Sequence, residues 1–180
     1  MTVPLAAGSI TGTVKVARAR DHRDAVVYID RIAGKQFPPS ENPVVLDQVN
    51  LVFLPHVLPV LVGTTVAFPN NDTVRHNVFS PSPAKRFNLG TNAQKVTKNV
   101  LFDKPGVVAL LCNVHAEMSA YVIVTETPYF AVTNPAGEYK IASVPAGSYV
   151  LKAWHESSKP KEQKIEVREG APVRADFDLR

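Results

Sequence analysis

A thiol, an imidazole and a thioether lie within one seven-residue stretch of the chain. Cys112, His115 and Met118 follow the spacing Cys-x2-His-x2-Met. These soft and borderline ligands together suit copper. Such a site needs one more imidazole, and His76 is the best candidate because a turn-rich stretch leads to it and an apolar one follows it. Two His and one Cys with a weak axial Met form the ligand set of a blue-copper electron-transfer site.

Each of these residues also has a simpler explanation. A lone Cys at the end of a strand is usually a small buried hydrophobe, Met118 can fill a core, and His76 can be a turn histidine. The Cys-x2-His pair could also be a nucleophile with its base, or part of a zinc site. The zinc interpretation lacks further Cys, since Cys112 is the only one, and the nucleophile interpretation lacks a third group. The combination of ligand types therefore favours copper.

Two apolar runs flank the ligand stretch. Gly106–Leu111 is continuously apolar and predicts a buried strand. Ala120–Thr125, which is rich in β-branched and aromatic residues, predicts a second strand. The ligands are therefore expected on a short loop between two rigid strands, which suits a site whose geometry the protein imposes.

A longer pattern precedes the ligands. The stretch from Phe53 to Asp72 reads FLPHVLPVLVGTTVAFPNND, and its "P…V..G..V.F.N.D" pattern resembles a strand pair of the cupredoxin family of plastocyanin, amicyanin and pseudoazurin. The resemblance runs from about Val44 to Thr125, and the spacing of the ligand loop is similar to that of amicyanin. It implies a Greek-key β-sandwich that binds one copper ion, cycling between Cu(I) and Cu(II), per chain.

The resemblance also assigns roles to individual residues. It implies that the copper ligands are His76, Cys112, His115 and Met118. It further implies that Asn77, which follows the first ligand, holds the two ligand loops together and braces the thiolate sulfur through a backbone donor. Hydrogen bonds of this kind tune a metal site as much as its ligands do.

Two further expectations concern where electrons pass. Because His115 lies on the loop next to apolar residues, it is expected to have an edge near solvent and to be the ligand through which electrons pass. The resemblance implies that a docking patch at the same end of the domain is formed by Pro55, Val57, Leu58 and Pro59. Electron-transfer encounters are small and transient, so such a patch need not be large.

Composition bounds the remaining possibilities. Fifteen Pro and nine Gly between short Val-, Ile- and Tyr-rich runs favour an all-β protein. A net charge of +4 without a Lys/Arg-rich run gives no indication of nucleic-acid binding. No stretch approaches the roughly 20 apolar residues of a membrane helix. The segment from Met1 to Gly8 is not an intact signal peptide, and the cupredoxin resemblance leads us to expect a periplasmic or extracytoplasmic protein whose export signal has been removed.

The C-terminal third of the chain has a different sequence pattern. Tyr129–Trp154 contains the turns Asn-Pro-Ala-Gly and Val-Pro-Ala-Gly between alternating strands. It resembles the carboxypeptidase regulatory-like, transthyretin-type β-sandwich, an accessory domain. Such sandwiches open with the patterns "I.G.V" and "A.V.I", which occur here at Ile10–Val14 and Ala25–Ile29, before the copper region.

These positions predict a nested arrangement. Residues 8–33 plus 126–180 are expected to form the smaller sandwich, with the cupredoxin domain inserted as 34–125. The alternative is two consecutive domains, 8–125 and 126–180.

The finer expectations concern local structure. One strand is expected over Val44–Leu54, and a long polar connection over Ser80–Lys98. Trp154 is expected in the core of the smaller sandwich, with His155 exposed, and His22 is expected in a solvated loop.

Two kinds of function fit these features. The first is a carrier of single electrons between redox partners, such as a cytochrome or a copper or quinoprotein enzyme. The second is a copper-handling module (chaperone or store) or a structural binding module. An enzyme is not expected, because a second metal centre needs several more His and the remaining ones, His22, His56 and His155, are scattered.

Overall fold

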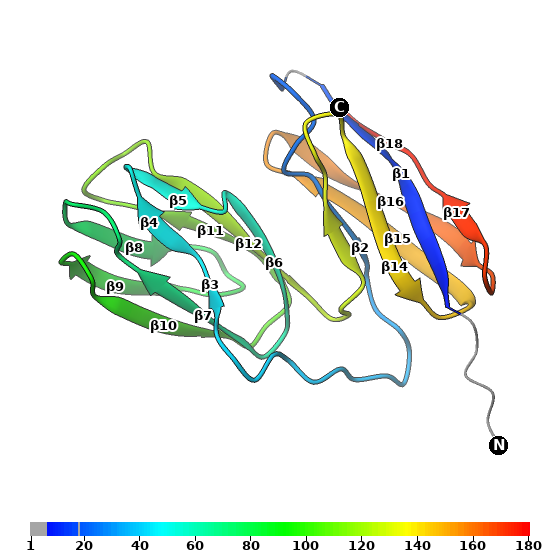
Figure 1. Ribbon diagram of the computed structural model, residues 1–180, viewed down its shortest axis with the longest axis horizontal. Helices are drawn as coiled ribbons and strands as arrows, with labels where there is room; N and C mark the ends of the chain where they lie inside the picture. The colour runs from blue at the N-terminus through cyan, green and yellow to red at the C-terminus, as the bar shows by residue number, and fades with distance from the viewer. Residues whose placement is uncertain (1–6, 18) are drawn as a thin grey trace. The chain divides into compact units, whose positions relative to one another are not determined.

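The computed structural model describes residues 7–17 and 19–180. These residues form eighteen β-strands and no helix (Figure 1), which confirms the prediction of an all-β protein. Among them there is accordingly no helix long and apolar enough to cross a membrane.

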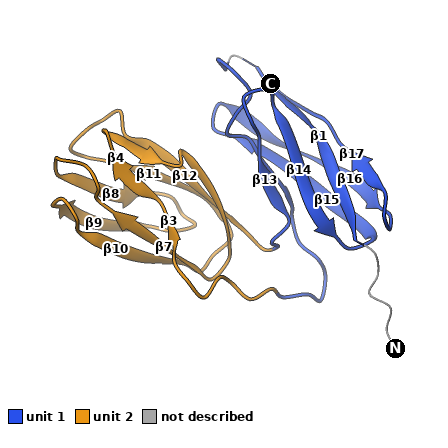
Figure 2. Ribbon diagram, in the orientation of Figure 1, with its two compact units in different colours: residues 1–36, 127–180 blue, residues 37–126 orange. Residues whose placement is uncertain are grey.

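The chain divides into two compact units (Figure 2). Unit 1 combines both chain ends, residues 1–36 and 127–180, and unit 2 comprises residues 37–126. The chain therefore leaves unit 1 once and returns to it once.

Unit 1 consists of two facing groups of strands. One sheet has the order β14-β1-β17, with β18 also pairing β1, and the other has the order β13-β2-β15-β16. The strands of this unit are β1 (Gly8–Val16), β2 (Val26–Ile29), β13 (Phe130–Val132), β14 (Glu138–Val144), β15 (Gly147–His155), β16 (Ser158–Val167), β17 (Pro172–Arg174) and β18 (Phe177–Leu179).

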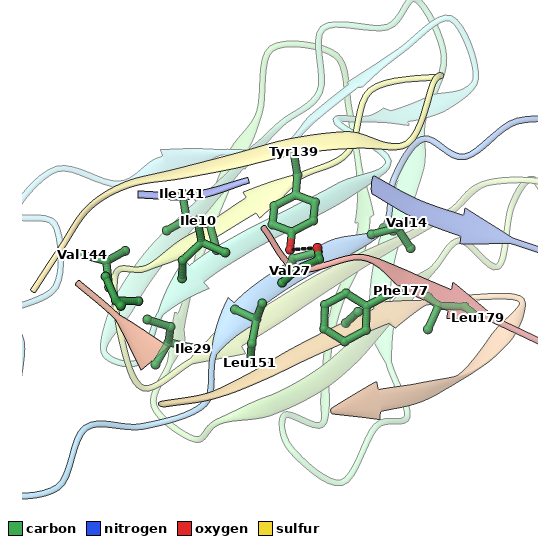
Figure 3. Packing of buried hydrophobic residues seen from close by; sticks show 14 of the residues in the cluster. Ile10, Val14, Val27, Ile29, Tyr139, Ile141, Val144, Leu151, Phe177 and Leu179 are labelled. Carbon is green, nitrogen blue, oxygen red and sulfur yellow. Dashed lines mark hydrogen bonds between the residues drawn. The ribbon is translucent and has the colours of Figure 1, made fainter. Parts of the chain in front are cut away.

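The N-terminal strands lie inside these sheets rather than at their edges. β1 pairs antiparallel with β14 on one side and parallel with β17 and β18 on the other. β2 pairs with β13 and β15. The alternation of β1 points Ile10 and Val14 into the core, where they join Val27, Ile29 and other apolar side chains from both sheets (Figure 3).

Two features of this core depend on single residues. Tyr139 is 6 % exposed, and its hydroxyl donates a 2.6 Å hydrogen bond to the carbonyl oxygen of Ala175 (Figure 3). Gly137 closes the Asn134 turn with a φ of 82°, and a Cβ there would lie 2.3 Å from the carbonyl oxygen of Val14. Only glycine fits that position without strain.

Unit 2 contains the candidate ligands. Its main sheet has the order β6-β12-β11-β8-β9, and smaller sheets have the orders β10-β7-β3 and β4-β5. The strands of this unit are β3 (Val44–Val45), β4 (Asp47–Val49), β5 (Val52–Leu54), β6 (Val57–Leu61), β7 (Thr64–Pro69), β8 (His76–Ser80), β9 (Phe87–Asn92), β10 (Thr97–Phe102), β11 (Gly106–Leu111) and β12 (Ser119–Thr125).

Two local predictions for unit 2 are wrong. The single strand expected over Val44–Leu54 is three short strands, because Asn50 and Leu51 adopt left-handed φ values of 53° and 62° and turn the chain between β4 and β5. The polar connection expected over Ser80–Lys98 contains the whole of β9, which pairs with β8. Polar composition hid β9, because an edge strand with one solvated face needs few apolar residues.

Two histidines of unit 1 are more enclosed than the sequence suggested. His155, expected to be exposed, is 7 % exposed and ends β15 beside the buried Trp154. His22, expected in a solvated loop, is half-buried, and its Nδ1 accepts a hydrogen bond from the backbone N–H of Val16 at 3.2 Å. Local polarity therefore does not predict how far these two side chains are buried.

Candidate metal centre

Strand alternation carries Cys112 into the interior. Val108 and Leu110 of β11 are fully buried, and Cys112 continues their face one residue past the end of the strand, at 6 % exposure. His76 begins β8 and is 0 % exposed. Because β8 and β11 are hydrogen-bonded neighbours in one sheet, their register brings these two side chains from positions far apart in sequence to one place.

The loop between β11 and β12 folds around the sulfur. The backbone N–H groups of Val114 and His115 point to the Sγ of Cys112 at 3.4 and 3.5 Å. The backbone N–H of Met118 donates to the carbonyl oxygen of His115 at 3.1 Å. Two backbone N–H groups aimed at the sulfur hold it in place within the loop.

Three of the four predicted ligands come together. The ligand atoms of His76, Cys112 and His115 all lie within 4.8 Å of one another. The Nδ1 atoms of the two histidines face each other at 3.1 Å, and their ring centroids are 4.9 Å apart. Cys112 and His76 are buried, whereas His115 is half-buried.

The fourth predicted ligand, Met118, lies in the interior. It is 1 % exposed and belongs to the same hydrophobic cluster as Cys112. It also lines a cavity of about 300 Å³ with the β5 residues Val52 and Leu54 and with His56. Its role as an axial ligand stays a prediction.

Asn77 does not have its predicted contact. Among the described residues, the hydrogen bonds to the sulfur come from the ligand loop itself and not from Asn77. The side-chain N–H of Asn77 donates to Asn88 Oδ1 at 2.8 Å, and its own Oδ1 is buried without a hydrogen-bond partner. The expected brace on the thiolate is therefore supplied by loop N–H groups that the sequence pattern did not single out.

The predicted docking patch is also only partly at the surface. Val57 is 3 % exposed, so it cannot contribute to a docking surface, whereas Pro55, Leu58 and Pro59 are half-buried. Leu58, the next residue of β6, packs against the hydrophobic cluster of unit 2, whereas Val57 lies outside that cluster and is buried where β6 pairs with β12. Exposed large apolar side chains occur instead on the ligand loop, on the loop before His76 and on the β4–β5 hairpin: Val114, Val74, Leu51, Val52 and Leu54.

One residue of the site was missed at the sequence level. The Oδ2 of Asp72 lies 2.9 Å from the Nε2 of His76, and Asp72 is 7 % exposed. The same oxygen accepts the backbone N–H of Leu51 at 2.7 Å, and Oδ1 accepts that of Thr73 at 2.7 Å. The N–H of Leu51, followed by the hydrogen bond from His76, lowers the pKa of Asp72 to about 2. The sequence offered one signal for this contact: an Asp four residues before the candidate ligand His76. The stretch that contains it was predicted only to form a turn.

Asn70 holds the loop that carries Asp72. Its side chain is 0 % exposed, and its Nδ2 donates to the carbonyl oxygens of Val74 and Asn92. Its Oδ1 accepts the backbone N–H of Asp72 at 3.0 Å. A buried amide whose hydrogen bonds are satisfied in this way fixes loop geometry. The segment that leads into His76 is therefore held by Asn70 at both Asp72 and Val74.

The chemistry of these donors fits a copper ion. Two imidazoles and one thiolate match the trigonal set of a blue-copper site. Nitrogen and sulfur ligands bind an ion at about 2.0–2.3 Å. Ligand atoms that lie within 4.8 Å of one another, as these do, are therefore close enough to share one ion. The two Nδ1 atoms also face each other without an intervening protein group, so a cation between them would use both lone pairs.

Comparison with known sequences gives two findings. Residues 116–180 match the family model of the carboxypeptidase regulatory-like domain. This match starts inside the ligand loop and includes β12 of unit 2, whereas β1 and β2, which complete the sandwich of unit 1, lie outside it. No curated protein matches the chain.

The solved structures similar to the chain include copper proteins. A Cu-containing nitrite reductase from Thermus scotoductus is 26 % identical with a TM-score of 0.46, covering 55 % of this chain and 25 % of its own. The chain thus spans about a quarter of the length of that reductase. A purple cupredoxin from Nitrosopumilus maritimus is 24 % identical with a TM-score of 0.42, covering 46 % of this chain and 99 % of its own. An oxidised amicyanin variant is 22 % identical with a TM-score of 0.44, covering 47 % and 84 %.

Proposed function

We propose that this protein is a type 1 copper protein that carries single electrons between redox partners outside the cytoplasm. One observation carries the proposal: the ligand atoms of His76, Cys112 and His115 converge within 4.8 Å at the edge of the hydrophobic cluster that contains Cys112. Copper bound by these residues would supply a one-electron couple between Cu(II) and Cu(I).

The surrounding protein supports this role by holding the ligands still. His76 and Cys112 are fixed by neighbouring strands, and the loop N–H groups fix the sulfur. A ligand set that does not rearrange between two oxidation states favours fast electron exchange. The buried cluster around Cys112 and Met118 covers the sulfur side of the site, where Cys112 is 6 % exposed.

The partners belong to the proposal as well. We infer a redox protein on each side, a cytochrome or a copper or quinoprotein enzyme, that meets unit 2 near the half-buried His115. The adjacent Val114 is 47 % exposed, and an apolar contact of this kind suits a transient complex. We also propose an extracytoplasmic location, as the resemblance of the sequence to cupredoxins implies.

The test is an absorption titration of the apoprotein with Cu(II). We expect an intense thiolate-to-copper band that saturates at about one ion per chain, since the chain has one Cys. Chemical reduction should bleach the band, and re-oxidation should restore it. Cys112→Ala should abolish the colour, because the thiolate produces it.

A matched pair of histidine variants controls for general effects. His76→Ala should lose the band, whereas His22→Ala, in unit 1 and outside the cluster, should keep it. Colour that survives Cys112→Ala would refute the assignment. Stoichiometric copper without a thiolate band would point to a copper-handling site, and a preference for Zn²⁺ over both copper ions would refute electron transfer.

A further inference from the structure

We propose that Asp72 is the positioning residue of the copper site: its carboxylate fixes the His76 imidazole so that Nδ1 faces the metal, and it favours the higher oxidation state. This inference rests on the proposed function. Its structural half, the control of His76, can be tested without any metal.

The contacts around Asp72 require an acceptor. Four donors converge on its two oxygens. The backbone N–H of Leu51 and the Nε2 of His76 point to Oδ2, and the backbone N–H and hydroxyl of Thr73 point to Oδ1. An ionised carboxylate accepts at both oxygens and donates at neither. An amide in its place would turn an N–H₂ group toward one of these donors.

This arrangement determines the tautomer of His76. Because Asp72 Oδ2 only accepts, the hydrogen must lie on His76 Nε2. In the neutral imidazole, Nδ1 then carries a lone pair, and that lone pair faces His115 Nδ1 at 3.1 Å. His76 is thus ready to bind a metal through Nδ1 in the folded apoprotein. Carboxylate-to-histidine bonds fix ligand tautomer and raise ligand basicity in metal sites generally.

The negative charge has a second effect. Asp72 is 7 % exposed and His76 is 0 % exposed, so water screens their interaction weakly. A more basic imidazole and a nearby negative charge both stabilise Cu(II) more than Cu(I). Asp72 should therefore lower the reduction potential of the site.

Asp72 also connects the site to the surface. Its Oδ2 is shared between His76 and the backbone of Leu51. Leu51 is 48 % exposed and lies at the left-handed turn of the β4–β5 hairpin. The carboxylate therefore links an exposed hairpin turn to a buried candidate ligand. Its hydrogen bond to the N–H of Leu51 helps to hold that residue at its left-handed φ of 62°.

The experiment compares three variants with the wild-type chain. Asp72→Ala removes the acceptor, and Asp72→Asn keeps an oxygen but removes the charge. Asp103→Asn removes the same charge from an exposed Lys85 ion pair in the same unit and serves as the control. Imidazole ¹⁵N shifts of the apoprotein report the tautomer, and a Cu(II) titration and a redox titration report affinity and potential.

We expect the wild type and Asp103→Asn to show His76 in the Nε2–H tautomer and Asp72→Ala to show a mixture. Asp72→Ala should bind Cu(II) about 10–100-fold more weakly. Asp72→Asn should keep the tautomer and raise the potential. A tenfold loss of preference for Cu(II) corresponds to about 59 mV for one electron.

Two results would overturn the inference: an unchanged tautomer in Asp72→Ala, or an unchanged potential in Asp72→Asn. If the wild-type chain bound no copper while the tautomer still followed Asp72, the proposed function would fail and the positioning role would stand. If Asp72→Ala did not fold, Asp72→Asn would still decide, because an unaltered potential in a folded variant contradicts the charge effect.

Discussion

Removing the N-terminal strands from unit 1 should prevent its folding. A fragment spanning Pro128–Arg180 retains six of the eight strands but lacks β1 and β2. Both missing strands are interior, so the fragment would contain two sheets that are each split along the middle. The open edges would also expose unpaired backbone groups and favour aggregation.

The size of the loss follows from the buried side chains. β1 and β2 contribute six Val and Ile residues that are each at most 3 % exposed: Ile10, Val14, Val16, Val26, Val27 and Ile29. Burial of one such side chain contributes roughly 1.5–3 kcal/mol, so together they contribute roughly 9–18 kcal/mol. Whole domains are stable by only about 5–15 kcal/mol. The remaining strands cannot offset a loss of this size.

The assay is amide dispersion in an NMR spectrum of the fragment, with a fusion as its control. The control joins residues 8–30 to 127–180 through a short Gly-Ser linker. The junction allows this, because the N–H of Ile29 donates to the carbonyl of Tyr129 at 2.9 Å and Thr127 Oγ1 donates to the carbonyl of Ile29 at 2.8 Å. We expect a collapsed spectrum for the fragment and a dispersed one for the fusion.

A dispersed spectrum from the fragment alone would refute the reasoning and favour the consecutive arrangement of domains, 8–125 followed by 126–180. A disordered fusion would also count against the nested arrangement, because the fusion contains every strand of unit 1. Neither result would bear on the candidate copper ligands, since all of them lie in unit 2.

Three further variants test single contacts. Met118→Leu should keep copper and raise the reduction potential measured by redox titration, because an electron-rich axial donor is lost; loss of copper would show that Met118 is more than axial. Tyr139→Phe should lower the free energy of unfolding by about 1–2 kcal/mol, because it leaves the carbonyl of Ala175 without its donor. Burial raises the pKa of Tyr139 well above its usual range, so this contribution is complete below about pH 10 and is lost as the pH rises; the variant should be less sensitive to alkali in denaturant titrations. Gly137→Ala should cost more than about 1 kcal/mol in the same assay, since it forces a left-handed residue against the carbonyl of Val14; a neutral effect would mean that the turn relaxes.

The candidate cluster of His76, Cys112 and His115 could be predicted from sequence because its geometry is mostly local. Cys112, His115 and Met118 share one loop, and the apolar run before Cys112 fixes which way its side chain points. Only His76 required a long-range assumption, and the β8–β11 pairing accounts for its position. The axial role of Met118 stays a prediction.

The residues that support the ligands were harder to predict. Asp72 acts through a side-chain oxygen whose direction depends on a loop held by Asn70, and no periodicity encodes that direction. Asn77 was assigned to the sulfur, but the loop N–H groups occupy that role. Val57 was assigned to the surface, but it is buried where β6 pairs with β12.

The fold was predictable in class and less so in detail. Alternating apolar residues and frequent Pro and Gly indicate strands wherever they occur, which gave the all-β class. The β4–β5 hairpin was missed because its turn uses Asn50 and Leu51 at positive φ. Leu is rare in that conformation, so the sequence gives no turn signal there beyond the single Asn.

The rigidity of the site is distributed unevenly among its ligands. His76 and Cys112 are buried, come from paired strands, and each has its own hydrogen-bonding partners in Asp72 and the loop N–H groups. His115 lies on the loop, is half-buried, and has the exposed Val114 beside it. Under the proposed function, His115 is therefore the ligand through which copper enters and electrons leave, while the two buried ligands hold the geometry. The difference between the two histidines accounts for the position of Asp72 next to His76. A buried ligand cannot reorient toward solvent, so the fold must determine which of its ring nitrogens faces the metal.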